Sequence, residues 1–188
     1  ARKLKKESAS LIIGELTKKV QSAEGSVGEL CNAASSPAKL SLEKLQEVHQ
    51  DTSSILSKVA RVNGELAELQ TSGDLIMETK VEFARLQLRC KALQRRAKAA
   101  AETLSGQYDR ITSAATEDLL NVLRSTAQGE DGAFNVDLLL KQLGVTDEVT
   151  EAAVTDYVLR AHPELSEERA KFAMHRLAPS GISRQGMQ

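Results

Sequence analysis

Basic side chains gather in one stretch of this sequence. Between Glu82 and Glu102 there is no acidic residue but six basic ones: Arg85, Arg89, Lys91, Arg95, Arg96 and Lys98. On a helix the six divide between two faces, with Arg85, Arg89 and Arg96 on one and the other three on its neighbour. Such a surface can bind an anionic partner, whether acidic protein tails, phospholipid or nucleic acid.

An alternative interpretation makes the same six residues a solvated flank, paired with Glu side chains of neighbouring helices. A bridge to Glu65 or Glu68 would favour this interpretation, whereas an open surface would favour anion binding. No aromatic residue lies among the basic ones, although proteins that bind single strands use aromatics to stack the bases. This absence argues against nucleic acid as a partner.

Residues that could perform catalysis do not form a recognisable set. The sequence has no glycine-rich phosphate loop, no CxxC, no HExxH and no nucleophile elbow. Its three histidines, His49, His162 and His175, lie far from one another and from any spacing typical of a triad or a metal site. We therefore predict a non-catalytic protein with no cofactor and no metal.

The composition favours an all-α protein. Hydrophobic residues make up 41% but aromatics only 3%, so Leu, Ala and Val must form the core, as in helix-on-helix packing. Cys31 and Cys90 occupy apolar helical positions, and we interpret them as buried thiols in the cytoplasm or another reducing compartment. No apolar run approaches the ~18 residues that would span a bilayer. The chain begins with Ala1 in place of Met, and its last residues, Ser183 to Gln188, have the pattern of a helix just starting. Both ends predict a fragment or a processed chain.

Heptad spacing in the first half predicts long helices that bury one stripe. The first segment has apolar residues at Leu16, Val20, Ala23, Val27, Leu30 and Ala34. A second series recurs every seven residues: Val48, Ile55, Val62, Leu69, Ile76, Phe83, Cys90, Ala97, Leu104 and Ile111. A flanking seam position accompanies this series. It lies three residues upstream before Gly73, at Leu45, Val59 and Leu66, and three residues downstream after it, at Leu86, Leu93 and Ala100. We expect the series to face the core.

The switch of flank falls on residues 71–74, and two arrangements are open there. One long helix can run through, since a straight helix drifts against a heptad repeat. Alternatively Gly73 ends one helix and Asp74 caps the next, which gives three antiparallel helices of similar length over 1–34, 38–70 and 75–106. Ser36 or Ser41 would cap the second helix. Three equal antiparallel helices resemble a spectrin-type repeat in architecture.

The second half is predicted to be a separate small helical domain. Charge changes from net basic before residue 115 to net acidic after it, and short helices follow a possible cap at Thr116. Gly132 with Phe134 two positions later, between two helices, resembles an EF-hand loop, and Ala178 to Ser183 resembles a second. In such a pair Ala133-Phe134 and Gly181-Ile182 would form a short ribbon. The segment 147–161 would be an inserted helix.

Calcium ligands are missing from these loops. With Gly132 at the sixth position, the ligand positions are occupied by Ala127, Gly129, Asp131, Asn135 and Leu138. One carboxylate does not replace the water shell of the ion, so the resemblance implies a fold used for packing. An unrelated small helical domain remains the alternative.

The sequence thus predicts an all-α chain in two domains. Residues 1–110 form a long antiparallel helical bundle, and 116–188 form a small helical domain resembling a degenerate EF-hand pair that is truncated at its C-terminus. The expected function is that of a structural or scaffolding module binding other proteins within a larger assembly. The alternative is a module that binds anionic partners through residues 85–98.

Overall fold

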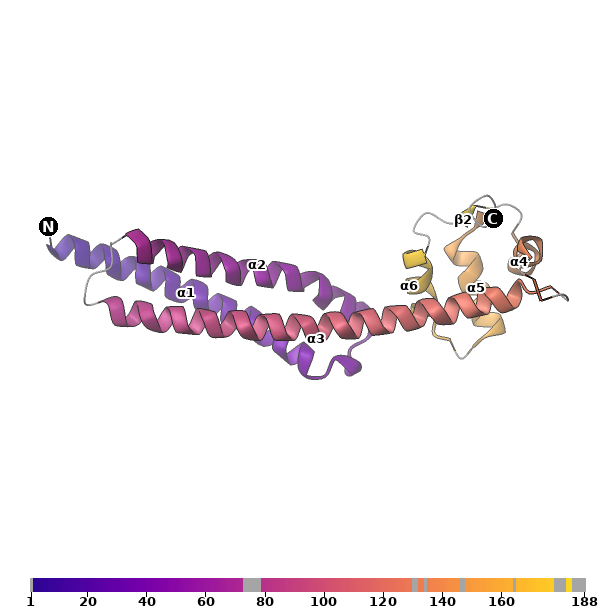
Figure 1. Cartoon of the computed structure of the whole chain (residues 1–188), viewed down its shortest axis with the longest axis horizontal. Helices are drawn as coiled ribbons and strands as arrows, with labels where there is room; N and C mark the ends of the chain where they lie inside the picture. The colour runs from indigo at the N-terminus through magenta and orange to yellow at the C-terminus, as the bar shows by residue number, and fades with distance from the viewer. Residues whose placement is uncertain are drawn as a thin grey trace. The chain divides into compact units, whose positions relative to one another are not determined.

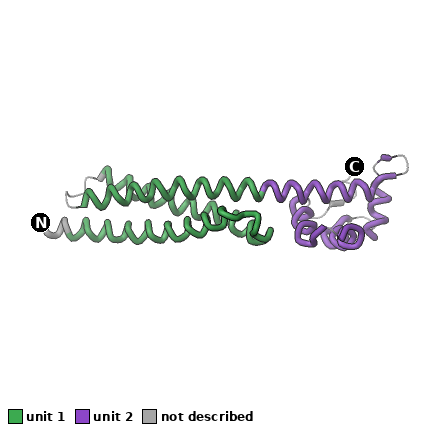
Figure 2. The backbone as a smooth tube through the Cα atoms, turned by 90° about the horizontal axis from the view of Figure 1, so that it is seen from below, with its two compact units in different colours: residues 1–108 green, residues 109–188 purple. Residues whose placement is uncertain are grey.

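The computed structural model is all-α, as predicted, apart from one ribbon of two-residue strands. It describes residues 2–72, 79–129, 132–133, 135–145, 148–163, 165–177 and 182–183. The chain divides into two compact units, residues 1–108 and 109–188, coloured separately in Figure 2. Each unit has its own hydrophobic core.

Three long helices build unit 1, and they lie side by side (Figure 1). Helix α1 spans Arg2–Ser35, α2 spans Leu42–Ser72, and α3 spans Lys80–Thr126 and continues into unit 2. A single 3-10 turn, η1 (Pro37–Lys39), connects α1 to α2. Ser41 caps α2, because its hydroxyl accepts a hydrogen bond from the Lys44 amide at 3.2 Å, whereas Ser36 makes no side-chain cap.

Side-chain contacts define α2 and α3 as antiparallel neighbours. Asn63 donates to Gln94 at 2.9 Å, and Gln87 donates to Gln70 at 2.8 Å, so later residues of α2 face earlier residues of α3. The alternative of one helix running through residues 71–74 is therefore wrong. Gly73 and Asp74 themselves lie outside the described residues.

The core of unit 1 follows the predicted seams of α1 and α3. In α1, Val20, Ala23 and Val27 are completely buried. In α3 both the sevenfold series and its downstream flank are buried over seven positions: Phe83, Leu86, Cys90, Leu93, Ala97, Ala100 and Leu104. Cys90 is buried as expected, while Cys31 is only half-buried against the core, and both thiols are free.

In α2 the predicted seam is buried mainly at its upstream flank, and of the sevenfold series within this helix only Val62 is buried. Ile55 and Leu69, members of the sevenfold series, are only half-buried. The buried stripe is the upstream flank, which includes Leu45, Val59 and Leu66. The two helices face the core with different phases because they are separate elements, so one unbroken series cannot describe both.

Helix α3 also runs further than predicted. Its expected end near residue 106 is wrong, because the helix continues to Thr126 without interruption. Thr116 does not cap a new helix: its hydroxyl donates to the Thr112 carbonyl at 2.8 Å, a bond made within a helix. Gly106 lies inside this helix, and α3 contributes residues to both units.

Unit 2 packs the end of α3 against three short helices. These are α4 (Val136–Leu143), α5 (Glu151–Ala161) and α6 (Glu167–Leu177), with α5 packed on α6. Asn135 caps α4 and Gly144 ends it in the left-handed conformation, as their types predict. Thr150 caps α5, so the helix begins later than the predicted residue 147.

The ribbon of unit 2 pairs β1 (Glu148–Val149) with β2 (Ile182–Ser183), antiparallel, with Val149 opposite Ile182. Ile182 takes part in the ribbon, as predicted. The predicted pairing of this strand with Ala133 is wrong, because its partner is β1. The backbone around Ala133 is bonded locally instead, since its carbonyl accepts from the Gly129 amide at 2.9 Å. Phe134 lies outside the described residues.

Candidate functional site: the outer surface of α3

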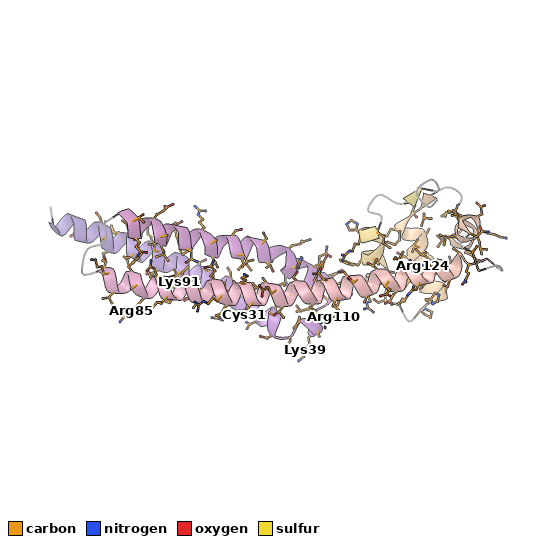
Figure 3. The ribbon with its side chains drawn as sticks, viewed as in Figure 1. Cys31, Lys39, Arg85, Lys91, Arg110 and Arg124 are labelled. Atoms are coloured by element: carbon orange, nitrogen blue, oxygen red, sulfur yellow. The ribbon has the colours of Figure 1, made fainter. Side chains whose placement is uncertain are left out.

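The basic segment belongs to the part of α3 that lies in unit 1. Because the buried seam occupies one side of the helix, the residues between seam positions point outward. Arg85, Lys91, Arg95, Arg96 and Lys98 are all exposed. Figure 3 labels Arg85 and Lys91 along the helix. The structure therefore places these five predicted residues on one continuous helical surface.

Arg89 is the member of the segment that the fold uses. Its Nε and Nη2 atoms donate to the two oxygens of Glu24 on α1, at 2.9 and 2.6 Å. This two-point hydrogen bonding raises the pKa of Arg89 above its usual value. Arg89 is thus turned toward Glu24 on α1.

The pairing partners proposed from the sequence are not the ones found. Glu65 binds Lys19 at 2.5 Å and Arg61 at 3.5 Å, so it serves α1 and its own helix. Sequence spacing missed Glu24, although its place beside the seam residue Ala23 puts it on a flank of the α1 core stripe. The ion pair between Arg89 and Glu24 joins neighbouring helices, as the solvated-flank interpretation requires, but it involves only one of the six basic residues.

The remaining basic side chains are weakly held or unpaired. Lys98 reaches Glu102 at 4.0 Å, and both side chains are at least 70% exposed, so this pair contributes little. Within the described part of the chain, Arg85, Lys91, Arg95 and Arg96 have no ion-pair partner. Their charge is therefore free to act on a molecule outside the chain.

Two large apolar residues lie on the same surface, and sequence reasoning missed them. Val81 is 61% exposed and Leu88 is 68% exposed, seven residues apart and hence on one side of α3. Their spacing continues to Arg95, so a second sevenfold series runs opposite the buried one. This second series could have revealed the exposed apolar residues from the sequence, but the longer buried series drew the interpretation to the opposite side of the helix.

A groove of about 310 Å³ between α1 and α2 is lined by Ile12, Leu16 and Leu69 together with the paired Lys19 and Glu65. Within this groove Lys19 and Glu65 already form an ion pair with each other.

The histidines do not converge. His49 stacks on Tyr108 with ring centroids 4.4 Å apart, His162 lies at the C-terminal end of α5, and His175 lies in the last turn of α6. Nowhere in the described ranges do three His, Cys, Asp or Glu residues gather as a metal site would require.

Comparisons with known proteins do not assign the chain. No protein family, curated protein or solved structure matches it significantly. Among the described helices, none is both long and apolar enough to cross a membrane.

Proposed function

We propose that the chain is a non-catalytic structural or scaffolding module that binds other proteins through its helical faces. The observation that carries this proposal is the exposed apolar pair Val81 and Leu88 on the outside of a bundle whose own core is filled. Apolar side chains aligned on one side of a helix, and not used by the fold, are typical of a contact surface. Long helices offer such surfaces over many turns.

Supporting this, the bundle is held mainly by apolar packing. The two long-range ion pairs described between its helices, Lys19–Glu65 and Arg89–Glu24, lie at the edges of the core. Substitutions on the outer surface should leave the fold intact, so the proposal can be tested without unfolding the protein.

A second candidate is a module that binds anionic partners through residues 85–98. The observation that favours it is the set of four exposed basic residues without ion-pair partners in the described residues. Acidic protein tails, lipid or nucleic acid would supply the complementary charge. The mixture of apolar and basic side chains on one face favours a protein partner over the other two.

We also propose that unit 2 resembles a calcium-free EF-hand pair. In support, the ribbon joins the α4–α5 connection to the segment after α6, as the loops of such a pair are joined. The first loop would then be the α4–α5 connection rather than residues 127–138. In this proposal unit 2 acts by packing and not as a calcium sensor.

The scaffold proposal is tested on the native assembly. The full chain is recovered from its own cells, cross-linked through lysines, and treated with nuclease and with a lipid-dissolving detergent. We expect cross-links to discrete proteins at lysines on outer helical surfaces, such as Lys18 and Lys91, and these should survive both treatments. A chain recovered alone, or only with nucleic acid or lipid, would contradict the proposal.

A further inference from the structure

The exposed side of α3 has the pattern of a helix seam. Val81, Leu88 and Arg95 follow one another at seven-residue intervals. Three alanines lie on the same side of the helix, each three or four residues after one of these positions: Ala84, Ala92 and Ala99. All six residues are exposed. We call this set the outer seam of α3. It extends over residues 81–99, about 28 Å at a rise of about 1.5 Å per residue.

Basic side chains border the outer seam on both sides. Arg85 and Arg96 lie along one edge, and Lys91 and Lys98 lie along the other. Acidic residues are absent between Glu82 and Glu102, so positive charge borders the seam from Arg85 to Lys98. In coiled coils the residues at these bordering positions select the partner by charge.

We propose that the outer seam binds an acidic amphipathic helix of another protein, an inference that rests on the scaffold function. The partner would present Leu and Ala toward Val81 and Leu88, with Glu along both of its edges. A Glu on the partner's own seam would pair with Arg95. The alanines of α3 let the two helix backbones approach closely, which a larger side chain would prevent.

The outer seam fits a helix better than the other anionic surfaces. A lipid surface would require Arg95 to lie among the apolar side chains, where insertion buries a charge. A nucleic acid would place phosphates against Val81 and Leu88, which can make no hydrogen bond. An acidic helix satisfies both the apolar centre and the basic edges.

A second copy of this chain fits less well. Among the described residues, the other large exposed apolar pair in unit 1 is Leu11 and Ile12, with Glu7 and Glu15 one turn away on either side. This patch covers about two turns, whereas the outer seam covers about five. A partner helix of about three heptads is needed to cover the outer seam.

The probe is a synthetic helix of three heptads with Leu and Ala on its seam and Glu on both edges. A second peptide of the same composition has the Glu residues moved to its back. Binding of labelled peptide to the full chain is measured by fluorescence anisotropy at about 50 and 200 mM salt, a range over which exposed charges become screened. We expect binding of the first peptide only, weaker at the higher salt.

Two variants locate the site. Arg85→Glu with Arg95→Glu should weaken binding about tenfold or more, because attraction becomes repulsion at two points. The matched control is Lys18→Glu with Lys39→Glu, which changes net charge equally at two exposed lysines, and it should weaken binding less than about twofold. Leu88→Ala should weaken binding several-fold without any change in charge.

Three kinds of outcome would contradict the proposal, and each identifies a different cause of binding. Equal binding of both peptides, or equal losses in the seam and control variants, would mean attraction by net charge alone. Binding of anionic vesicles or of a DNA duplex, lost in the seam variant while the peptide does not bind, would replace the helix by that partner. Self-association in sedimentation that the seam variant abolishes would make a second copy the occupant.

Cross-linking in the native assembly distinguishes a wrong binding site from a wrong scaffold function. If the chain carrying Arg85→Glu and Arg95→Glu still retains its cross-linked proteins in the native assembly, the scaffold stands and the outer seam is not the site. If the unmodified chain retains no protein at all, the scaffold function itself is wrong.

Discussion

Leu66 and Leu69 lie one turn apart on α2, and alanine substitution at each tests which side of the helix faces the core. Leu66 is 1% exposed and belongs to the cluster that unites α1, α2 and α3. Leu69 is half-buried and lines the groove between α1 and α2. Because the substitution is the same, the two variants differ only in what surrounds the leucine.

The magnitudes follow from burial. Leu66→Ala removes a fully buried side chain and leaves a cavity, so it should lower the free energy of unfolding by about 3 kcal/mol. Leu69→Ala removes a side chain that already contacts solvent across the groove of about 310 Å³, so water can fill the space. Its cost should be about 1 kcal/mol, near half of a full transfer term.

Urea unfolding of the full chain, followed by far-UV circular dichroism, measures both free energies. The slope against urea should be unchanged in each variant, so the midpoints alone report stability. Equal costs, or a larger cost at Leu69, would refute the burial argument and restore the sevenfold series as the core stripe of α2.

Further substitutions and labelling test separate contacts. Gly144→Ala should cost about 1 kcal/mol because φ is +71° there, whereas Gly106→Ala should stabilise α3 by about 0.5–1 kcal/mol, both measured by urea unfolding. Arg89→Ala should cost under about 1 kcal/mol in the same assay, since its ion pair is more than a third exposed. Cys31 should react with a thiol reagent well before Cys90, because burial shields Cys90 and raises the pKa of its thiol. The difference between the two reaction rates should narrow only as the pH rises. Equal rates near neutral pH would contradict this.

The helical class and the α3 core stripe could be predicted because apolar residues repeat there without a polar exception. In α2 the buried stripe contains Thr52, which is 9% exposed. Its hydroxyl donates to the Val48 carbonyl at 2.8 Å, so its polar group is satisfied within the helix. A search for apolar periodicity finds this stripe interrupted at Thr52, so the unbroken series through Ile55 and Leu69 ranks above it.

The candidate site was predictable in part. Its basic residues lie close together within one helix, so their clustering can be seen directly in the sequence. The Arg89–Glu24 pair joins residues 65 positions apart, and it depends on which helices become neighbours. The ribbon partner of Ile182 was mispredicted for the same reason, since Val149 and Ala133 are equally plausible as short apolar segments until the local bonding of residues 127–135 is known.

The continuity of α3 has a consequence for how the chain acquires its structure. Starting a helix is unfavourable, with a nucleation constant of about 10⁻³, but each later residue adds at little cost. Since the boundary between Tyr108 and Asp109 falls inside α3, whichever unit orders first supplies the other with a helix end that is already started. Separating the chain at that peptide bond would oblige residues 109–126 to nucleate anew, so the isolated second unit should fold more slowly than it does in the full chain.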